Sequence, residues 1–119
     1  MNNILIRLSQ SKFRNSFHLK QKDFDYINSK DMETIKGHAY DFIRTRLSDT
    51  SNVVDGKQTP THGHPVFIAQ HATATCCREC LLKWHKIEKN RLLTDKETDF
   101  VVNLILSWIE KEISNQHKV

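Results

Sequence analysis

The sequence predicts an all-α protein: a single compact domain, residues 1–119, of five or six helices with one long loop at about 48–63. Two segments support this, Asp31–Leu47 and the stretch that follows Thr94, because both repeat apolar residues at helical spacing. No segment shows the strong alternation of apolar and polar residues that is typical of β-strands. A chain of 119 residues, 38% of them hydrophobic, can bury a core without disulfides.

The N-terminal part contains short elements. Residues 1–8 are predicted to form a short helix or an extended arm. Phe13 and Phe17 are four residues apart, which places both rings on one face of a helix. That face either anchors the segment on the core or, with its basic neighbours, contacts phosphates and bases. A further short helix is expected over Gln21–Ser29.

The segment Asp31–Leu47 is the first of two long predicted helices. Asp31 can cap its start, and two arginines near its end suit the helix dipole. Its apolar stripe consists of Ile35, Ala39, Phe42, Ile43 and Leu47. The following loop, 48–63, is rich in turn-forming residues and leads directly into a stretch of histidines and cysteines.

Two short helices are predicted within that stretch. The first runs from His64 to about Ala72, since Pro65 suits the first position of a helix, although the β-branched residues of this run also permit a strand. The second runs over Cys76–Ile87, with Thr75 as its N-cap. A basic connector then leads to the last helix.

The last helix is the clearest element. Thr94 and Glu97 form a capping box, in which each side chain can bond the backbone of the other residue. The helical stripe that follows consists of Val101, Leu104, Ile105, Trp108, Ile109 and Ile113. Residues 115–119 are expected to fray.

The segment Thr61–His85 holds all three cysteines and four of the seven histidines. One hypothesis is structural: on a helix, Cys77 and Cys80 share a face with Leu81 and Trp84 and pack in the core. Helix packing does not explain the other candidates in and around the segment, so they carry most of the functional prediction. They are His64, His71, Cys76 and Arg78.

The leading functional hypothesis is a transition-metal site. Cys77 and Cys80 have the C-x-x-C spacing with which two thiolates bind one zinc ion. The predicted ligands are Cys77, Cys80, His64 and His71, with Cys76 and His85 as alternates. Zinc is favoured over iron, and an Fe–S cluster on three cysteines and one histidine ranks lower.

Thiol chemistry is an alternative. Cys76 or Cys77 would be the nucleophile, because a helix N-terminus and the adjacent Arg78 favour a thiolate. His71 or His64 would act as the base of a Cys/His pair. The C-x-x-C sequence also has the form of a dithiol redox motif.

Charge leads to a third hypothesis. The net charge of +4 permits binding to nucleic acid or another polyanion. The predicted contacts are Lys12, Arg14, Lys57 and Arg78. No apolar run is long enough to span a membrane, and the N-terminal residues lack the features of a signal peptide, so a cytoplasmic location is expected.

Five blocks of the sequence resemble a known family. They are SKFRNSFHL, GHAYDFIRTRL, DGKQTP, GHPVFIAQHATATCCRECLLKWHKI and LTDKETDFVVNLILSWIE. From about Leu8 to Ile113 the chain resembles a small bacterial family known as domain of unknown function 4186. The resemblance implies a short, stand-alone intracellular domain and implies no particular reaction, cofactor or catalytic residue.

Overall fold

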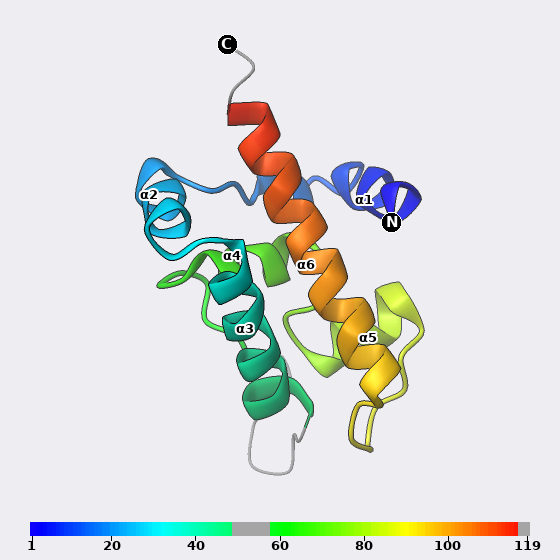
Figure 1. The fold of residues 1–119 in the computed structure, drawn as a ribbon. Helices are drawn as coiled ribbons and strands as arrows, with labels where there is room; N and C mark the ends of the chain where they lie inside the picture. Colours follow the sequence, from blue (N-terminus) through cyan, green and yellow to red (C-terminus); the bar gives the residue numbers. More distant parts are fainter. Residues whose placement is uncertain (49–57, 117–119) are drawn as a thin grey trace.

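The computed structural model describes residues 1–48 and 58–116. Over these residues it contains six α-helices, one short 3-10 helix and one π-helical segment, with no strand, which confirms the all-α prediction (Figure 1). The elements are α1 (Asn2–Ser9), η1 (Arg14–Ser16), α2 (Gln21–Lys30), α3 (Met32–Phe42), η2 (Ile43–Ser48), α4 (Pro65–Ala72), α5 (Arg78–His85) and α6 (Asp95–Gln116). Most of the predicted long loop, 49–57, lies outside the described residues.

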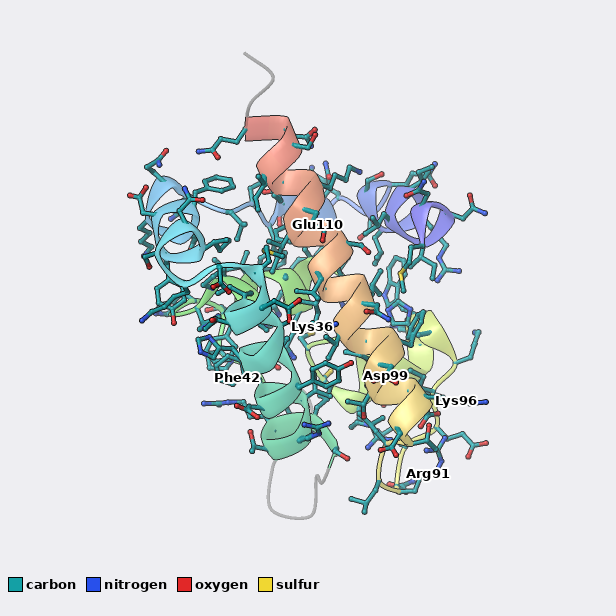
Figure 2. All side chains as sticks on the ribbon, viewed as in Figure 1. Lys36, Phe42, Arg91, Lys96, Asp99 and Glu110 are labelled. Atoms are coloured by element: carbon teal, nitrogen blue, oxygen red, sulfur yellow. The ribbon has the colours of Figure 1, made fainter. Side chains whose placement is uncertain are left out.

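Helix α6 is the longest element, and it packs against α3, η2 and α4 (Figure 1). The predicted capping box is present: the Glu97 amide donates to Thr94 Oγ1 at 3.1 Å, and the Thr94 amide donates to Glu97 Oε1 at 2.9 Å. Asp99 and Glu110 are exposed on the outer side of α6 (Figure 2). The helix continues through Gln116, so residues 115 and 116 of the expected frayed tail are helical.

The predicted helix Asp31–Leu47 is present, but its last part changes geometry. Asp31 caps α3 by accepting the Thr34 amide at 2.9 Å. From Ile43 the helix widens into the π-helical segment η2. The apolar stripe continues through this change, because Ile43 and Leu47 are fully buried, as Ile35 and Ala39 of α3 are, whereas Phe42 is partly buried.

Residues 2–9 form a helix rather than an extended arm. Leu5 and Leu8 of α1 are buried against the rest of the protein. On the exposed side, Arg7 Nη2 donates to the Trp84 carbonyl at 2.7 Å and so connects α1 to α5.

Helix α5 begins two residues later than the sequence predicted. Its N-cap is Cys77, whose sulfur accepts the Cys80 amide at 3.4 Å, and its first helical residue is Arg78. Thr75 does not cap α5: its hydroxyl lies 3.0 Å from that of Thr73, and its amide bonds the Gln70 carbonyl at 2.8 Å at the end of α4. Ala74, with φ +57°, reverses the chain between the two helices. Cys76 therefore lies in a turn, Cys77 is the helix cap, and only Cys80 lies within the helix, so the three cysteines do not share one helical face.

Candidate functional site

The three cysteine sulfurs converge at the start of α5. The Sγ atoms of Cys76, Cys77 and Cys80 lie within 4.8 Å of one another, and those of Cys76 and Cys80 are 3.7 Å apart. All three thiols are free. Cys76 and Cys77 are buried, whereas Cys80 is partly exposed. We call these three residues the cysteine cluster.

A buried polar network holds the turn before the cluster. The Gln70 side chain donates to the Thr75 carbonyl at 3.1 Å, and its Nε2 also lies 3.3 Å from the Thr59 hydroxyl. Thr59 in turn donates to the Cys76 carbonyl at 2.7 Å. Since buried polar groups are costly to leave unpaired, this network fixes the backbone from which Cys76 projects.

Arg14 brings a positive charge to the cysteine cluster from the N-terminal part of the chain. Its Nη2 donates to Cys80 Sγ at 3.2 Å, and its Nη1 donates to Cys76 Sγ at 3.6 Å and to the His71 carbonyl at 2.8 Å. Arg14 is only 9% exposed, and its amide is bonded to Ser11 in the turn of η1. The cluster is therefore a contact between two distant parts of the sequence.

The contacts within the cluster separate the pKa values of its thiols. Hydrogen bonds from Cys76 and Cys77, followed by the contact with Arg14, hold the pKa of Cys80 well below its usual range. The pKa of Cys76 is raised by its hydrogen bonds with Cys77 and Cys80 and by burial. Burial alone would lower the pKa of Arg14, but its bonds to Cys76 and Cys80 outweigh burial and raise that pKa. The cluster thus favours one thiolate, on Cys80, paired with one guanidinium.

The histidines that the sequence placed beside these cysteines make other contacts. His71 Nε2 lies 3.2 Å from the Thr59 carbonyl and 3.1 Å from the Pro60 carbonyl, and its ring stacks on Phe17. His85 Nε2 lies 2.8 Å from the Thr73 carbonyl. Among the residues described, the group of close metal-ligating atoms contains the three cysteines and no histidine.

His64 belongs to a separate pair. Its Nδ1 accepts the Val66 amide at 3.0 Å, so Nε2 carries the proton and donates to His38 Nδ1 at 3.1 Å. The ring also packs against Tyr26 and Phe42. Burial first, and His38 second, lower the pKa of His64 to about 4. The structure therefore does not bring His64 or His71 to Cys77 and Cys80 as ligands, nor to Cys76 or Cys77 as a base.

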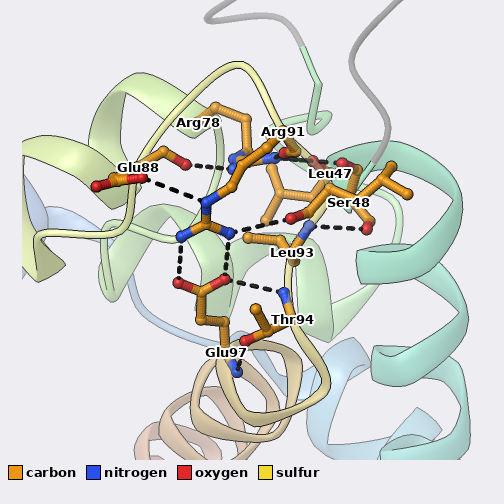
Figure 3. A network of polar contacts seen from close by, with 9 residues as sticks. Leu47, Ser48, Arg78, Glu88, Arg91, Leu93, Thr94 and Glu97 are labelled. Atoms are coloured by element: carbon orange, nitrogen blue, oxygen red, sulfur yellow. Dashed lines mark hydrogen bonds and ion pairs between the residues drawn. The ribbon is translucent and has the colours of Figure 1, made fainter.

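Arg78 is adjacent to the cysteines in sequence, but its side chain lies among backbone carbonyls (Figure 3). Nη1 donates to the carbonyls of Ser48 at 3.2 Å and Arg91 at 2.8 Å and lies 3.4 Å from that of Leu47, while Nη2 donates to the Glu88 carbonyl. Arg78 is 1% exposed. Its predicted role at an anion does not agree with this placement, because a buried guanidinium bonded to carbonyls has little contact with an anion in solution.

Within the part of the chain that the structure describes, the predicted nucleic-acid contacts do not form a shared exposed surface. Arg14 and Arg78 are buried, Lys12 is exposed, and Lys57 lies outside the described residues. The arginines are buried because each binds acceptors of the protein itself. Across residues 1–48 and 58–116, no helix combines the length and the apolar character that crossing a membrane requires.

Sequence analysis missed the two features that define the site. It placed Arg14 at an anion-binding surface, and it named Cys76 or Cys77 as the activated nucleophile, with Cys80 only as a metal ligand or as part of a dithiol motif. Arg14 and Cys80 are 66 positions apart, so no local spacing connects them. The basic and aromatic residues around Arg14 were a visible signal, but they predicted an exposed surface that binds anions rather than a contact with a thiol.

The fold and the cluster define a small all-helical domain with a largely buried three-cysteine centre next to an arginine. The family model described as Domain of unknown function (DUF4186) matches residues 2–110, and the chain therefore belongs to this family, as the resemblance predicted. No solved structure matches the chain.

Proposed function

We propose that the domain binds one transition-metal ion, with zinc favoured, through Cys76, Cys77 and Cys80. The observation that supports this is the convergence of three sulfurs within 4.8 Å. Tetrahedral zinc with Zn–S bonds of about 2.3 Å requires sulfur–sulfur separations of about 3.8 Å. The separation of 3.7 Å between Cys76 and Cys80 is close to this value. Soft thiolate ligands also favour zinc over magnesium or calcium.

Charge balance favours the same proposal. Three thiolates and one Zn²⁺ carry a net charge of −1, which is costly in a buried site unless a cation is nearby. Arg14 provides that cation, and its N–H groups already lie against Cys80 and Cys76. Hydrogen bonds to ligand sulfurs also orient them and stabilise their deprotonated state.

The fourth ligand of such a centre would not come from the histidines in their present positions, since each is bonded elsewhere. Three protein ligands leave one coordination position for water or a small ligand, as in many zinc sites that bind substrates. A reducing compartment such as the cytoplasm would keep the three thiols available for the metal.

The test is metal content and cobalt substitution. Protein purified under reducing conditions without chelators should contain about one zinc ion per chain, and a content below about 0.1 would count against the proposal. Cobalt-loaded protein should show intense thiolate-to-cobalt charge-transfer bands. Serine substitution of any one of the three cysteines should weaken metal binding by at least about tenfold.

Histidine variants separate this ligand set from the one predicted from spacing. His64→Asn and His71→Asn should retain wild-type metal content, because neither ring lies at the sulfurs. If a histidine variant loses the metal and Cys76→Ser keeps it, the set Cys77, Cys80, His64 and His71 is the better description. Circular dichroism of each variant checks that the helices are intact.

A further inference from the structure

We propose that Cys76 and Cys80 form a reversible disulfide in the metal-free protein, in a reaction that begins when Cys80 is oxidised by a hydroperoxide. This activity does not require the metal-binding proposal to be correct. It concerns the same sulfurs, so a bound metal and the disulfide would exclude one another.

The first argument is the sulfur contact. The Sγ atoms of Cys76 and Cys80 are 3.7 Å apart, which is van der Waals contact between sulfurs. A disulfide requires about 2.05 Å, so the two atoms need to approach by less than about 2 Å. Cys76 precedes the first residue of α5, so a small backbone adjustment at Cys76 would not break a helical turn.

The second argument concerns Cys77, which the C-x-x-C sequence would select as the partner of Cys80. In the structure Cys77 is the N-cap of α5, and its sulfur accepts the Cys80 amide at 3.4 Å. The Cys77 sulfur also lies within 4.8 Å of the Cys80 sulfur, but a bond between them would draw it away from the Cys80 amide and so remove this cap from the helix. A bond between the adjacent Cys76 and Cys77 would close a strained ring through their shared peptide bond. Cys76 is therefore the favoured partner.

The third argument is access. Cys76 is 7% exposed and Cys77 is 4% exposed, whereas Cys80 is partly exposed. An oxidant in solution consequently reaches Cys80 first. Arg14 Nη2 lies 3.2 Å from the Cys80 sulfur, which places a hydrogen-bond donor beside the incoming peroxide oxygens.

The reaction has two steps. The Cys80 thiolate attacks one oxygen of the hydroperoxide: the S–O bond forms, the O–O bond breaks, and the departing oxygen takes a proton from water and leaves as an alcohol, or as water from hydrogen peroxide. The Cys76 sulfur then attacks the sulfur of the Cys80 sulfenic acid. The S–S bond forms, and the hydroxyl group leaves with the Cys76 proton as water. The two thiols lose two electrons in total, and the hydroperoxide gains them.

Peptide mapping provides the test. Chelator-treated, reduced protein is exposed to a stoichiometric amount of hydrogen peroxide, alkylated and digested with trypsin without reduction. Trypsin cleaves after Arg78, so a disulfide to Cys80 joins two peptides that otherwise separate. We expect the joined peptide, and a loss of two hydrogen atoms in the intact mass, for the wild type and for Cys77→Ser. Addition of a reducing agent should reverse both changes.

Cysteine variants identify the partner. Cys77→Ser is the matched control, because serine is also a good N-cap and removes only the sulfur. In Cys76→Ser the joined peptide should be lost, and dimedone should trap a sulfenic acid on Cys80. The proposal is overturned if folded wild-type protein gives no joined peptide, or if the joined peptide persists in Cys76→Ser and disappears in Cys77→Ser.

The two proposals fail separately. Metal content is measured on reduced protein without peroxide, and the disulfide is measured on metal-free protein. Metal binding without a joined peptide overturns the disulfide alone, and a joined peptide without metal binding overturns the metal site alone. If both are correct, prior loading with zinc should slow formation of the joined peptide by about tenfold or more.

Discussion

Arg14 and Arg78 are both buried, at 9% and 1% exposure, but they bind different partners. Arg14 donates to the sulfurs of Cys80 and Cys76, where its charge favours a thiolate. Arg78 donates to neutral backbone carbonyls at the end of η2 and in residues 88–91 (Figure 3). The first arginine changes the chemistry of its neighbours, and the second satisfies hydrogen bonds that the chain would otherwise leave buried.

The comparison shows that adjacency in sequence is a poor guide to which arginine serves the thiols. Arg78 follows Cys77 directly, yet Cys77 is the N-cap, and the chain turns into α5 at that point. The side chain of Arg78 consequently enters the interior between the end of η2 and residues 88–91. Arg14, which is far away in the sequence, fills the place beside the sulfurs. Four substitutions, from the largest expected effect to the smallest, test this distinction.

Arg78→Met should have the largest effect on stability. It leaves several buried carbonyls without donors, each costing about 1–3 kcal/mol, so we expect a loss of about 3 kcal/mol or more in the free energy of unfolding. Urea denaturation followed by circular dichroism measures this change. Arg78→Lys is the matched control, and should lose less because an ammonium group can satisfy some of the carbonyls. A folded Arg78→Met protein of normal stability with altered cysteine reactivity would reverse the comparison.

Arg14→Met should affect the thiols more than the fold. We expect a loss of about 1–2 kcal/mol in stability, since fewer backbone acceptors are left unpaired. Hydrogen bonds from Cys76 and Cys77 would still lower the pKa of Cys80, but without Arg14 that pKa should move back toward its usual value. Alkylation of Cys80 with iodoacetamide, measured against pH, should then begin at higher pH. Arg14→Lys keeps the charge and is the matched control, so its alkylation should depend on pH as in the wild type. If Arg14→Met also leaves the pH dependence of alkylation unchanged, Arg14 does not stabilise the thiolate.

The helices were predictable because their signals are local. The capping box of Thr94 and Glu97 and the stripe ending at Leu47 depend on residues within a few turns of one another. The start of α5 was placed incorrectly, because Thr75 has the right side chain for an N-cap but its hydroxyl pairs with Thr73 just after α4 instead. Two adjacent helix ends compete for such residues, and local sequence does not determine the outcome.

The site was only partly predictable. The three cysteines are close in sequence, so their convergence could be anticipated from spacing. The contact of Arg14 with Cys80 and the pairing of His64 with His38 both depend on tertiary packing. A cluster of histidines and cysteines in sequence therefore separated into two sites in space.

His64→Asn tests that separation through pH. Burial and His38 lower the pKa of His64 from 6.5 to about 4, so the unfolded chain binds a proton at a higher pH than the folded protein does. Acidification from pH 6.5 to 4 therefore favours unfolding, and His64 contributes to the loss of stability in this window. Asparagine can still accept the Val66 amide as an N-cap, so the variant should show a shallower loss when urea midpoints are compared across this range. A slope equal to that of the wild type would mean that His64 is not the group that titrates.

Thr94→Ala should have the smallest effect on stability. It measures how much an exposed contact contributes to the free energy of unfolding, for comparison with the buried contacts of Arg78. Thr94 accepts the Glu97 amide at 3.1 Å at the exposed start of α6, where solvent can replace the lost bond. We expect a loss of about 1 kcal/mol in the free energy of unfolding, typical of a removed N-cap. Thr94→Ser, which keeps the hydroxyl group, is the matched control for the urea measurement. If Thr94→Ala lowers the free energy of unfolding as much as Arg78→Met does, the buried carbonyl contacts of Arg78 stabilise the fold no more than an exposed helix cap does. The structural role that distinguishes Arg78 from Arg14 would then be wrong.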